Sequence, residues 1–266
     1  MDTPKSVTPL REKPALQKFA YLGYDIGILL QNLKSLAMAE EWEYLNTPNY
    51  KPLPILYNYL FHTFTRVQEE GKIIEKNGLA SFNTGLITTN QQEIFMLFKK
   101  TIKGYSYLQF CNESDNILSK FNPLPERAKY FDDPSDLSFD PRLDLRVNID
   151  HIIDDPLNFE RFPADIQALP KHQLINTFNG AIEHAKKRIR RNYKTAIPQY
   201  FRGKYIPKGQ LQLLLPLCLR DHTKADLALA VYKSDGFYSG RTCLTLDMAI
   251  NNARLIAKPD DEWLKA

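Results

Sequence analysis

The sequence predicts an α+β fold with N-terminal helices, antiparallel or mixed strands in meanders, a central basic helix and a closing C-terminal helix. Apolar residues recur every three or four positions in several stretches, as they do on one face of an α-helix. Between those stretches lie short apolar runs bounded by turn residues, which are typical of strands. The chain has 266 residues and is 43% hydrophobic, so it can build a large core and is not intrinsically disordered.

The N-terminal part is expected to be a polar arm followed by helices. Residues 14–45 carry apolar side chains at helical spacing, although two glycines weaken the pattern. A proline-rich linker ends at Pro54, which suits the first position of a helix that continues over residues 55–70. We therefore expect an N-terminal arm and helical segment over residues 1–53 and a single α+β domain over residues 54–266.

The pattern then changes to that of strands. They are expected over residues 72–75, 79–86, 92–99 and 105–111. The Asn77-Gly78 pair favours a tight turn between the first two, because such turns need positive φ angles. Residues 112–174 are rich in Pro and Asp and are expected to be irregular apart from a short helix near residues 148–154. A stretch this long without regular structure is more often functional than a spacer.

A helix with one apolar and one basic face is predicted over residues 175–196. The apolar face consists of Phe178, Ile182, Ala185, Ile189, Tyr193 and Ala196, and the opposite face of Lys187, Arg190, Arg191 and Lys194. Basic groups bind phosphates and aromatic rings stack on bases, so this stretch is the candidate phosphate or nucleic-acid site. The candidate residues are Arg188, Arg191, Asn192, Tyr193 and Lys194, with Gln199 beside them. An ordinary solvated helix face would explain the same residues.

The charge of the chain is distributed unevenly. Residues 175–210 hold nine Lys or Arg and one acid, whereas residues 130–165 hold ten acids against three Arg. The acidic stretch either docks on the basic helix and neutralises it, or the two form opposite walls of one cleft.

Strands over residues 210–219, 226–233 and 240–246 and a helix over residues 248–257 complete the fold. Asp247, Asn251 and Arg254 are spaced i, i+4 and i+7, so they share a helix face where a strand ends, a common place for ligands. The alternative is a capping Asp above a solvated polar stripe.

Candidate catalytic residues are Asp150, His151 and Asp247. Histidine transfers protons near neutral pH, and Asp150 could form an acid/base pair with the adjacent His151. A helix N-terminus with an acidic first turn explains the same residues. Asn83 and Thr84 precede a glycine at a strand end and, with Asn251 and Arg254, are candidates for orienting a substrate; an ordinary strand and turn is the alternative.

Several functional classes are disfavoured by what the sequence lacks. It has no GxxxxGK[ST], GxGxxG, HExxH or GxSxG motif, so standard NTPase, dinucleotide-binding, zincin and serine-hydrolase functions are not indicated. Three cysteines without CxxC spacing argue against a disulfide framework or a zinc ribbon. The sequence matches no defined metal-ligand loop and does not identify a cofactor. An apolar run of membrane-spanning length and a signal-peptide pattern are both absent, so we expect a cytoplasmic protein without a membrane partner.

Several blocks of sequence together resemble a known family. They are Phe82-Asn83-Thr84-Gly85-Leu86, Asn148-Ile149-Asp150-His151, Arg161-Phe162-Pro163, Arg191-Asn192-Tyr193-Lys194, Gln212-Leu213-Leu214-Leu215-Pro216-Leu217 and Leu244-Thr245-Leu246-Asp247-Met248-Ala249. Over about residues 57–264 the chain resembles the domain-of-unknown-function family 3825. Its members are similar to proteins that place this domain after RNA-binding modules of the cold-shock or winged-helix type. The resemblance implies work on RNA or its nucleotides and assigns no catalytic activity.

Three functions are therefore compatible with the sequence. The first is a protein that binds RNA or nucleotide phosphate, including an RNA-processing enzyme. The second is a non-catalytic interaction module whose basic face binds an acidic partner, and the third is a hydrolase or transferase of small nucleotides. The sequence does not decide whether the protein is an enzyme.

Overall fold

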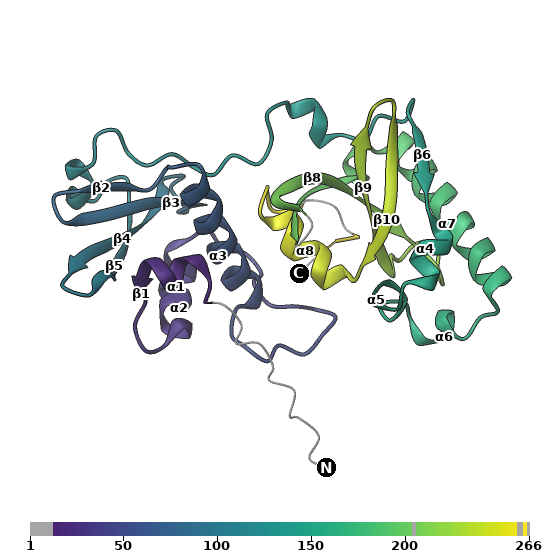
Figure 1. The fold of residues 1–266 in the computed structure, drawn as a ribbon, viewed down its shortest axis with the longest axis horizontal. Coiled ribbons are helices and arrows are strands. Elements are labelled where there is room, and N and C mark those ends of the chain that lie inside the picture. The colour runs from purple at the N-terminus through teal and green to yellow at the C-terminus, as the bar shows by residue number, and fades with distance from the viewer. Residues whose placement is uncertain (1–12, 204–205, 260–262, 265–266) are drawn as a thin grey trace, which may run out of the picture. The chain divides into compact units, whose positions relative to one another are not determined.

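The structure is a computed structural model that describes residues 13–203, 206–259 and 263–264. It has an α+β fold built on two five-stranded sheets, each of mixed direction, which confirms the predicted class (Figure 1). The contacts divide the chain into two compact units. Residues up to 40 and residues 60–128 form the first, and residues 41–59 and 129 onward form the second.

This division differs from the predicted one after residue 53. Residues 41–59 belong to the second unit because their polar side chains contact a helix near the C-terminus. The strands of residues 74–112, which we expected in the same domain as the C-terminal strands, form a sheet of their own in the first unit.

The first unit contains an antiparallel meander with one short parallel strand at its edge. Its elements are α1 (Ala15–Phe19), β1 (Ala20–Tyr21), α2 (Ile26–Leu36), part of α3 (Pro54–Glu69), β2 (Ile74–Lys76), β3 (Leu79–Ile87), β4 (Glu93–Thr101), β5 (Gly104–Asn112) and the 3₁₀ helix η1 (Asn116–Lys120). The sheet order is β1-β5-β4-β3-β2. Asn77 and Gly78 both have positive φ, as the predicted hairpin turn requires.

The helical region expected over residues 14–45 contains two separate helices, α1 and α2, because the chain is interrupted after α1. Gly23 has a φ of +94°, which an α-helix cannot accommodate, and β1 pairs with β5 just before it. In contrast, α3 confirms the helix expected after the proline-rich linker, and Gly71, at a φ of +67°, follows its end.

The second unit contains the other sheet, in the order β6-β10-β9-β8-β7. Its strands are β6 (Asp144–Val147), β7 (Ile197–Gly203), β8 (Ile206–Leu217), β9 (Leu227–Ser234) and β10 (Phe237–Leu244). Its helices are η2 (Pro134–Leu137), α4 (Ile149–Asp154), α5 (Pro156–Phe159), α6 (Ala164–Gln167), α7 (Lys171–Arg191), η3 (Tyr193–Thr195) and α8 (Leu246–Arg254). Strands β6 and β7, at the two edges, were not expected from the sequence.

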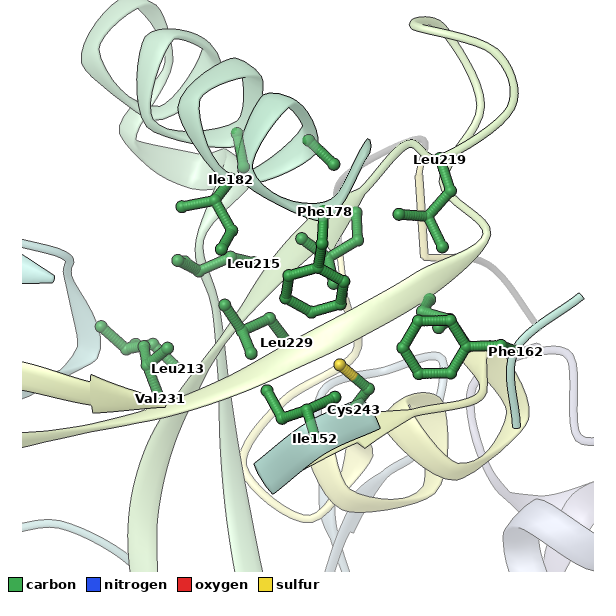
Figure 2. Close-up of a cluster of buried hydrophobic side chains, with 14 of the residues drawn as sticks. Ile152, Phe162, Phe178, Ile182, Leu213, Leu215, Leu219, Leu229, Val231 and Cys243 are labelled. Carbon is green, nitrogen blue, oxygen red and sulfur yellow. The ribbon is translucent and has the colours of Figure 1, made fainter. Parts of the chain in front are cut away.

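Two different layers cover the two faces of this second sheet. On one face, α7 buries Phe178 and Ile182 against leucines of β8 and β9 in a continuous apolar core (Figure 2). Alternate residues of β8 belong to that core, among them Leu213, Leu215 and Leu217, so Gln212 and Leu214 point to the other face. That other face is the one on which α8 packs, and α8 contacts mainly β7.

Candidate nucleic-acid interface

The last turns of α7 present a group of exposed cations. Lys187, Arg190, Arg191 and Lys194 are exposed, and Tyr193 beside them is 64% exposed. We call these five residues the cationic end. The apolar helix face was predicted to include Tyr193. In the structure α7 ends at Arg191, so Tyr193 is not part of this helix. The tyrosine instead begins η3.

Two of the other predicted phosphate-binding residues already have protein partners. Arg188 is half-buried and its Nη1 donates to Sγ of Cys218 at 3.7 Å. Burial raises the pKa of the Cys218 thiol, and Arg188 offsets part of that rise. Oδ1 of Asn192 accepts the backbone N–H of Lys194 at 3.1 Å and so caps η3. Through these contacts, Arg188 and Asn192 fix the structure at the C-terminal end of α7.

Two carboxylates of the acidic stretch of residues 130–165 form ion pairs with cations that do not belong to the cationic end. Asp154 pairs with Lys171 at 2.7 Å, and Asp136 pairs with Lys233 at 3.1 Å. Within the described ranges, neither Arg190 nor Arg191 has an ion pair. These two carboxylates are thus paired with other cations of the second unit, and Arg190 and Arg191 are exposed.

The predicted acid/base pair lies on the surface. Asp150 and His151 lie in the first turn of α4, where Oδ1 of Asn148 accepts the backbone N–H of His151 at 3.1 Å. The Asp150 side chain is 74% exposed and lies 3.6 Å from Nζ of Lys171. The hydrogen bond from Lys171 to Asp154 raises the pKa of the lysine, and Asp150 adds to that effect. In the part of the chain that the structure describes, no group of three or more His, Cys, Asp or Glu side chains is arranged to hold a metal ion.

The polar face predicted on the last helix exists and is largely buried. Asp247, only 6% exposed, accepts a hydrogen bond at Oδ1 from Nδ2 of Asn46 at 2.9 Å, while no described residue donates a hydrogen bond to its buried Oδ2. Asn251 bonds to Tyr44 and, at 3.1 Å, to Asn58. These partners come from residues 41–59, nearly two hundred positions earlier in the chain.

Arg254, the third member of this face, is held between two aromatic rings. Its guanidinium carbon lies 5.1 Å from the ring centroid of Trp42 and 4.6 Å from that of Tyr59. Both distances are within the range of a cation–π interaction, and the arginine is 9% exposed. Sequence reasoning missed Trp42 and Tyr59, because no local pattern links them to a helix at the other end of the chain.

Gln199 belongs to a chain of side-chain amides on the α8 face of the second sheet. It is fully buried; its Oε1 accepts from Nδ2 of Asn252 at 3.0 Å, and its Nε2 donates to Oε1 of Gln212 at 2.8 Å. Nε2 of Gln212 donates in turn to Oε1 of Gln210 at 3.3 Å. We call these four residues the amide relay. The alternation of Gln210 and Gln212 with leucines was the signal in the sequence that could have located it.

The structure does not bring the predicted site residues into one cleft. Arg188 and Asp150 come from α7 and α4, whose apolar residues join the core on one face of the sheet. Gln199 and Asp247 lie with α8 on the opposite face. The sheet therefore lies between the helices that carry Arg188 and Asp150 and the elements that carry Gln199 and Asp247.

Asn83 and Thr84 are buried in the first unit and shape a bulge of β3. Nδ2 of Asn83 donates to Glu93 at 2.9 Å, and its Oδ1 accepts the backbone N–H of Gly85 at 2.9 Å. Oγ1 of Thr84 donates to the carbonyl oxygen of Ile94 at 2.7 Å. The β3–β4 register shifts after Asn83, and Gly85 has a φ of +75°. These bonds account for both polar side chains without a ligand.

Residues 33–263 match a family model described as a domain of unknown function, DUF3825. No match is found among curated proteins, and none among solved structures. Within the described residues, no helix combines the length and the apolar character needed to cross a membrane.

Proposed function

Because the chain belongs to the family with the domain of unknown function DUF3825, whose description assigns no activity, the proposal rests on this molecule's own surface. We propose that the protein binds RNA through the sugar-phosphate backbone at the cationic end. Lys187, Arg190, Arg191 and Lys194 would contact successive phosphates. Tyr193 would offer its exposed ring to a base, as aromatic side chains do in proteins that bind single strands.

The observation that carries this proposal is the exposure of four cations within eight residues, next to an exposed aromatic ring. Part of that charge complements the helix dipole, which amounts to about half a negative charge at a helix C-terminus. The dipole therefore offsets less than one of the four cations. Asp154 and Asp136 of the acidic stretch, which would be the natural internal partner, are paired with Lys171 and Lys233.

Binding of this kind has a defined dependence on salt. For single strands, the slope of log affinity against log salt is about −0.7 for each phosphate neutralised, so four contacts give about −2.8. Raising the salt concentration from about 50 to about 200 mM should then weaken binding roughly 50-fold.

The test is a titration of the full chain with a labelled single-stranded RNA at these two salt concentrations. The Arg190→Ala, Arg191→Ala double variant should halve the slope to about −1.4, so that the same salt change weakens binding only about 7-fold. A Lys171→Ala, Lys233→Ala double variant removes the same net charge from ion-paired positions and serves as the control.

Two results would contradict the proposal. One is an unchanged slope in the arginine variant, and the other is an equal loss in the control variant. Displacement of the RNA by equimolar ATP would instead favour a site for small nucleotides, because a single nucleotide cannot replace four backbone contacts.

The cytoplasm is the compartment that suits this function. Among the described residues, Cys111, Cys218 and Cys243 are all free thiols and all buried. Free thiols are the usual state of cysteine in reducing compartments.

A further inference from the structure

The face of the second sheet that carries α8 also contains a groove of about 550 Å³. Its walls come from β7, β8, β9 and β10 and include Gln199, Phe201, Gln210, Gln212, Tyr232 and Arg241. A volume of this size is within the range of about 300–1,000 Å³ that is usual for small-molecule sites. The cationic end lies on α7 and η3, and none of its residues lines this groove.

The amide relay fixes the hydrogen-bonding character of the groove. All three of its hydrogen bonds run in the same direction, from Asn252 to Gln199, then to Gln212 and finally to Gln210. Each glutamine side-chain oxygen therefore accepts one hydrogen bond within the relay. The relay starts at Asn252, a half-buried residue of α8, and ends in the groove, where the Nε2 group of Gln210 makes no hydrogen bond to any described residue.

Arg241 adds further donors to the same groove. It is exposed at the bulge between Gly240 and Thr242, where the register of β10 against β9 shifts. Among the residues that the structure describes, its guanidinium makes no hydrogen bond and no ion pair. The groove therefore offers N–H donors from Arg241 and Gln210, and the side-chain oxygens of Gln210 and Gln212 each already accept one hydrogen bond.

Two aromatic side chains complete the walls. Phe201 and Tyr232 are half-buried and both line the groove. Aromatic rings offer a stacking surface to planar ligands. A planar ligand with adjacent acceptors on one edge would suit both the aromatic walls and the donors.

We infer that this groove binds an unpaired guanine base by its Hoogsteen edge. That edge presents two adjacent acceptors, O6 and N7, and arginine binding to both of them is the commonest specific contact to a base. Adenine and cytosine each present an amino donor on the corresponding edge, which would face the donors of Arg241 and Gln210. This inference concerns a site separate from the cationic end and does not depend on RNA-backbone binding there.

The test uses nucleosides, which carry no phosphate and so report on the groove alone. Binding of guanosine, inosine, 7-deazaguanosine and adenosine to the full chain is measured by saturation-transfer NMR. Guanosine and inosine share O6 and N7 and should bind alike. Adenosine, and 7-deazaguanosine, which lacks N7, should bind about tenfold or more weakly, as expected when a bidentate contact is lost.

Substitutions of two groove residues test whether guanosine binds in the groove. Arg241→Ala and Gln210→Leu should each weaken guanosine binding about tenfold. The control is Arg142→Ala, which removes another exposed arginine of the second unit, one paired with Asp140. Equal binding of guanosine and adenosine, no guanosine binding at about millimolar concentration, or wild-type affinity in Arg241→Ala would each overturn the inference.

Failure of this test is distinguishable from failure of the proposed function. The nucleosides do not probe the cationic end, and the salt slope of RNA binding does not probe base recognition. A protein with the predicted salt slope and no guanosine binding would keep the first proposal and lose the second.

Discussion

Replacing one amide of the relay has a cost that can be worked out from its hydrogen bonds. Gln199 makes one bond with Asn252 and one with Gln212, and Gln212 makes a further bond with Gln210. At about 1 kcal/mol of net stability for each bond, Gln199→Leu and Gln212→Leu should each lower the free energy of unfolding by about 2 kcal/mol. The double variant loses three bonds and not four, because the two residues share one. It should therefore cost about 3 kcal/mol, which is a coupling of about 1 kcal/mol.

The assay is urea unfolding followed by tryptophan fluorescence. Both tryptophans of the chain, Trp42 and Trp263, belong to the second unit, so the signal reports on the unit that contains the relay. A cycle of Gln199→Leu with Thr223→Ala, whose hydroxyl bonds to Asp221 in an exposed turn, should be additive. Additive losses for Gln199 and Gln212 as well would refute the relay as a connected set of hydrogen bonds.

Two further predictions concern the same unit. Gly209 has a φ of +76°, and a Cβ there would lie 2.4 Å from the ring of Tyr200, so Gly209→Ala should destabilise the unit by more than about 1 kcal/mol in the same urea titration. A wild-type midpoint would contradict that close approach. Hydrogen bonds from Arg142 lower the pKa of Asp140 to about 2. Because the unfolded pKa is higher, about 3.9, the ionised carboxylate stabilises the fold fully above that pH. This contribution to stability is lost as the pH falls toward 2. A carboxyl NMR titration should give a midpoint near 2 that moves up in Arg142→Ala; an unmoved midpoint would refute the pairing.

The elements that could be predicted from the sequence are those with a strong local pattern. The apolar positions of α7, the meander β8–β10 and the Asn77-Gly78 turn all carry their own signal. The two edge strands do not. Strand β6 alternates charged residues with apolar ones in only four positions and depends on β10 for its pairing. Strand β7 follows closely after a helix and contains a proline, which is usual only at the edge of a sheet.

The candidate site shows the same limit. The i, i+4, i+7 spacing correctly placed Asp247, Asn251 and Arg254 on one face, because helical spacing is local information. Their partners in residues 41–59 depend on the tertiary fold, and nothing in either stretch predicts the contact. Gln199 was placed beside the phosphate-binding candidates because β7 was not recognised as a strand, so the alternation of its side chains could not be used.

The order of the chain at β7 also connects the two proposed sites. Lys194 is the last residue of the cationic end, and Gln199, only five positions later, lies in the wall of the groove. Five residues span at most about 18 Å even when fully extended. Strand β7 is at the edge of its sheet, so the backbone passes from one face to the other there without crossing another strand.

If the cationic end binds the backbone of an RNA and the groove binds guanine, one short single-stranded RNA can reach both sites. Linked contacts of this kind raise affinity without any new contact. A guanine-containing oligonucleotide should then bind more tightly than an otherwise identical one without guanine, while both keep the same salt slope, since the phosphate contacts are shared.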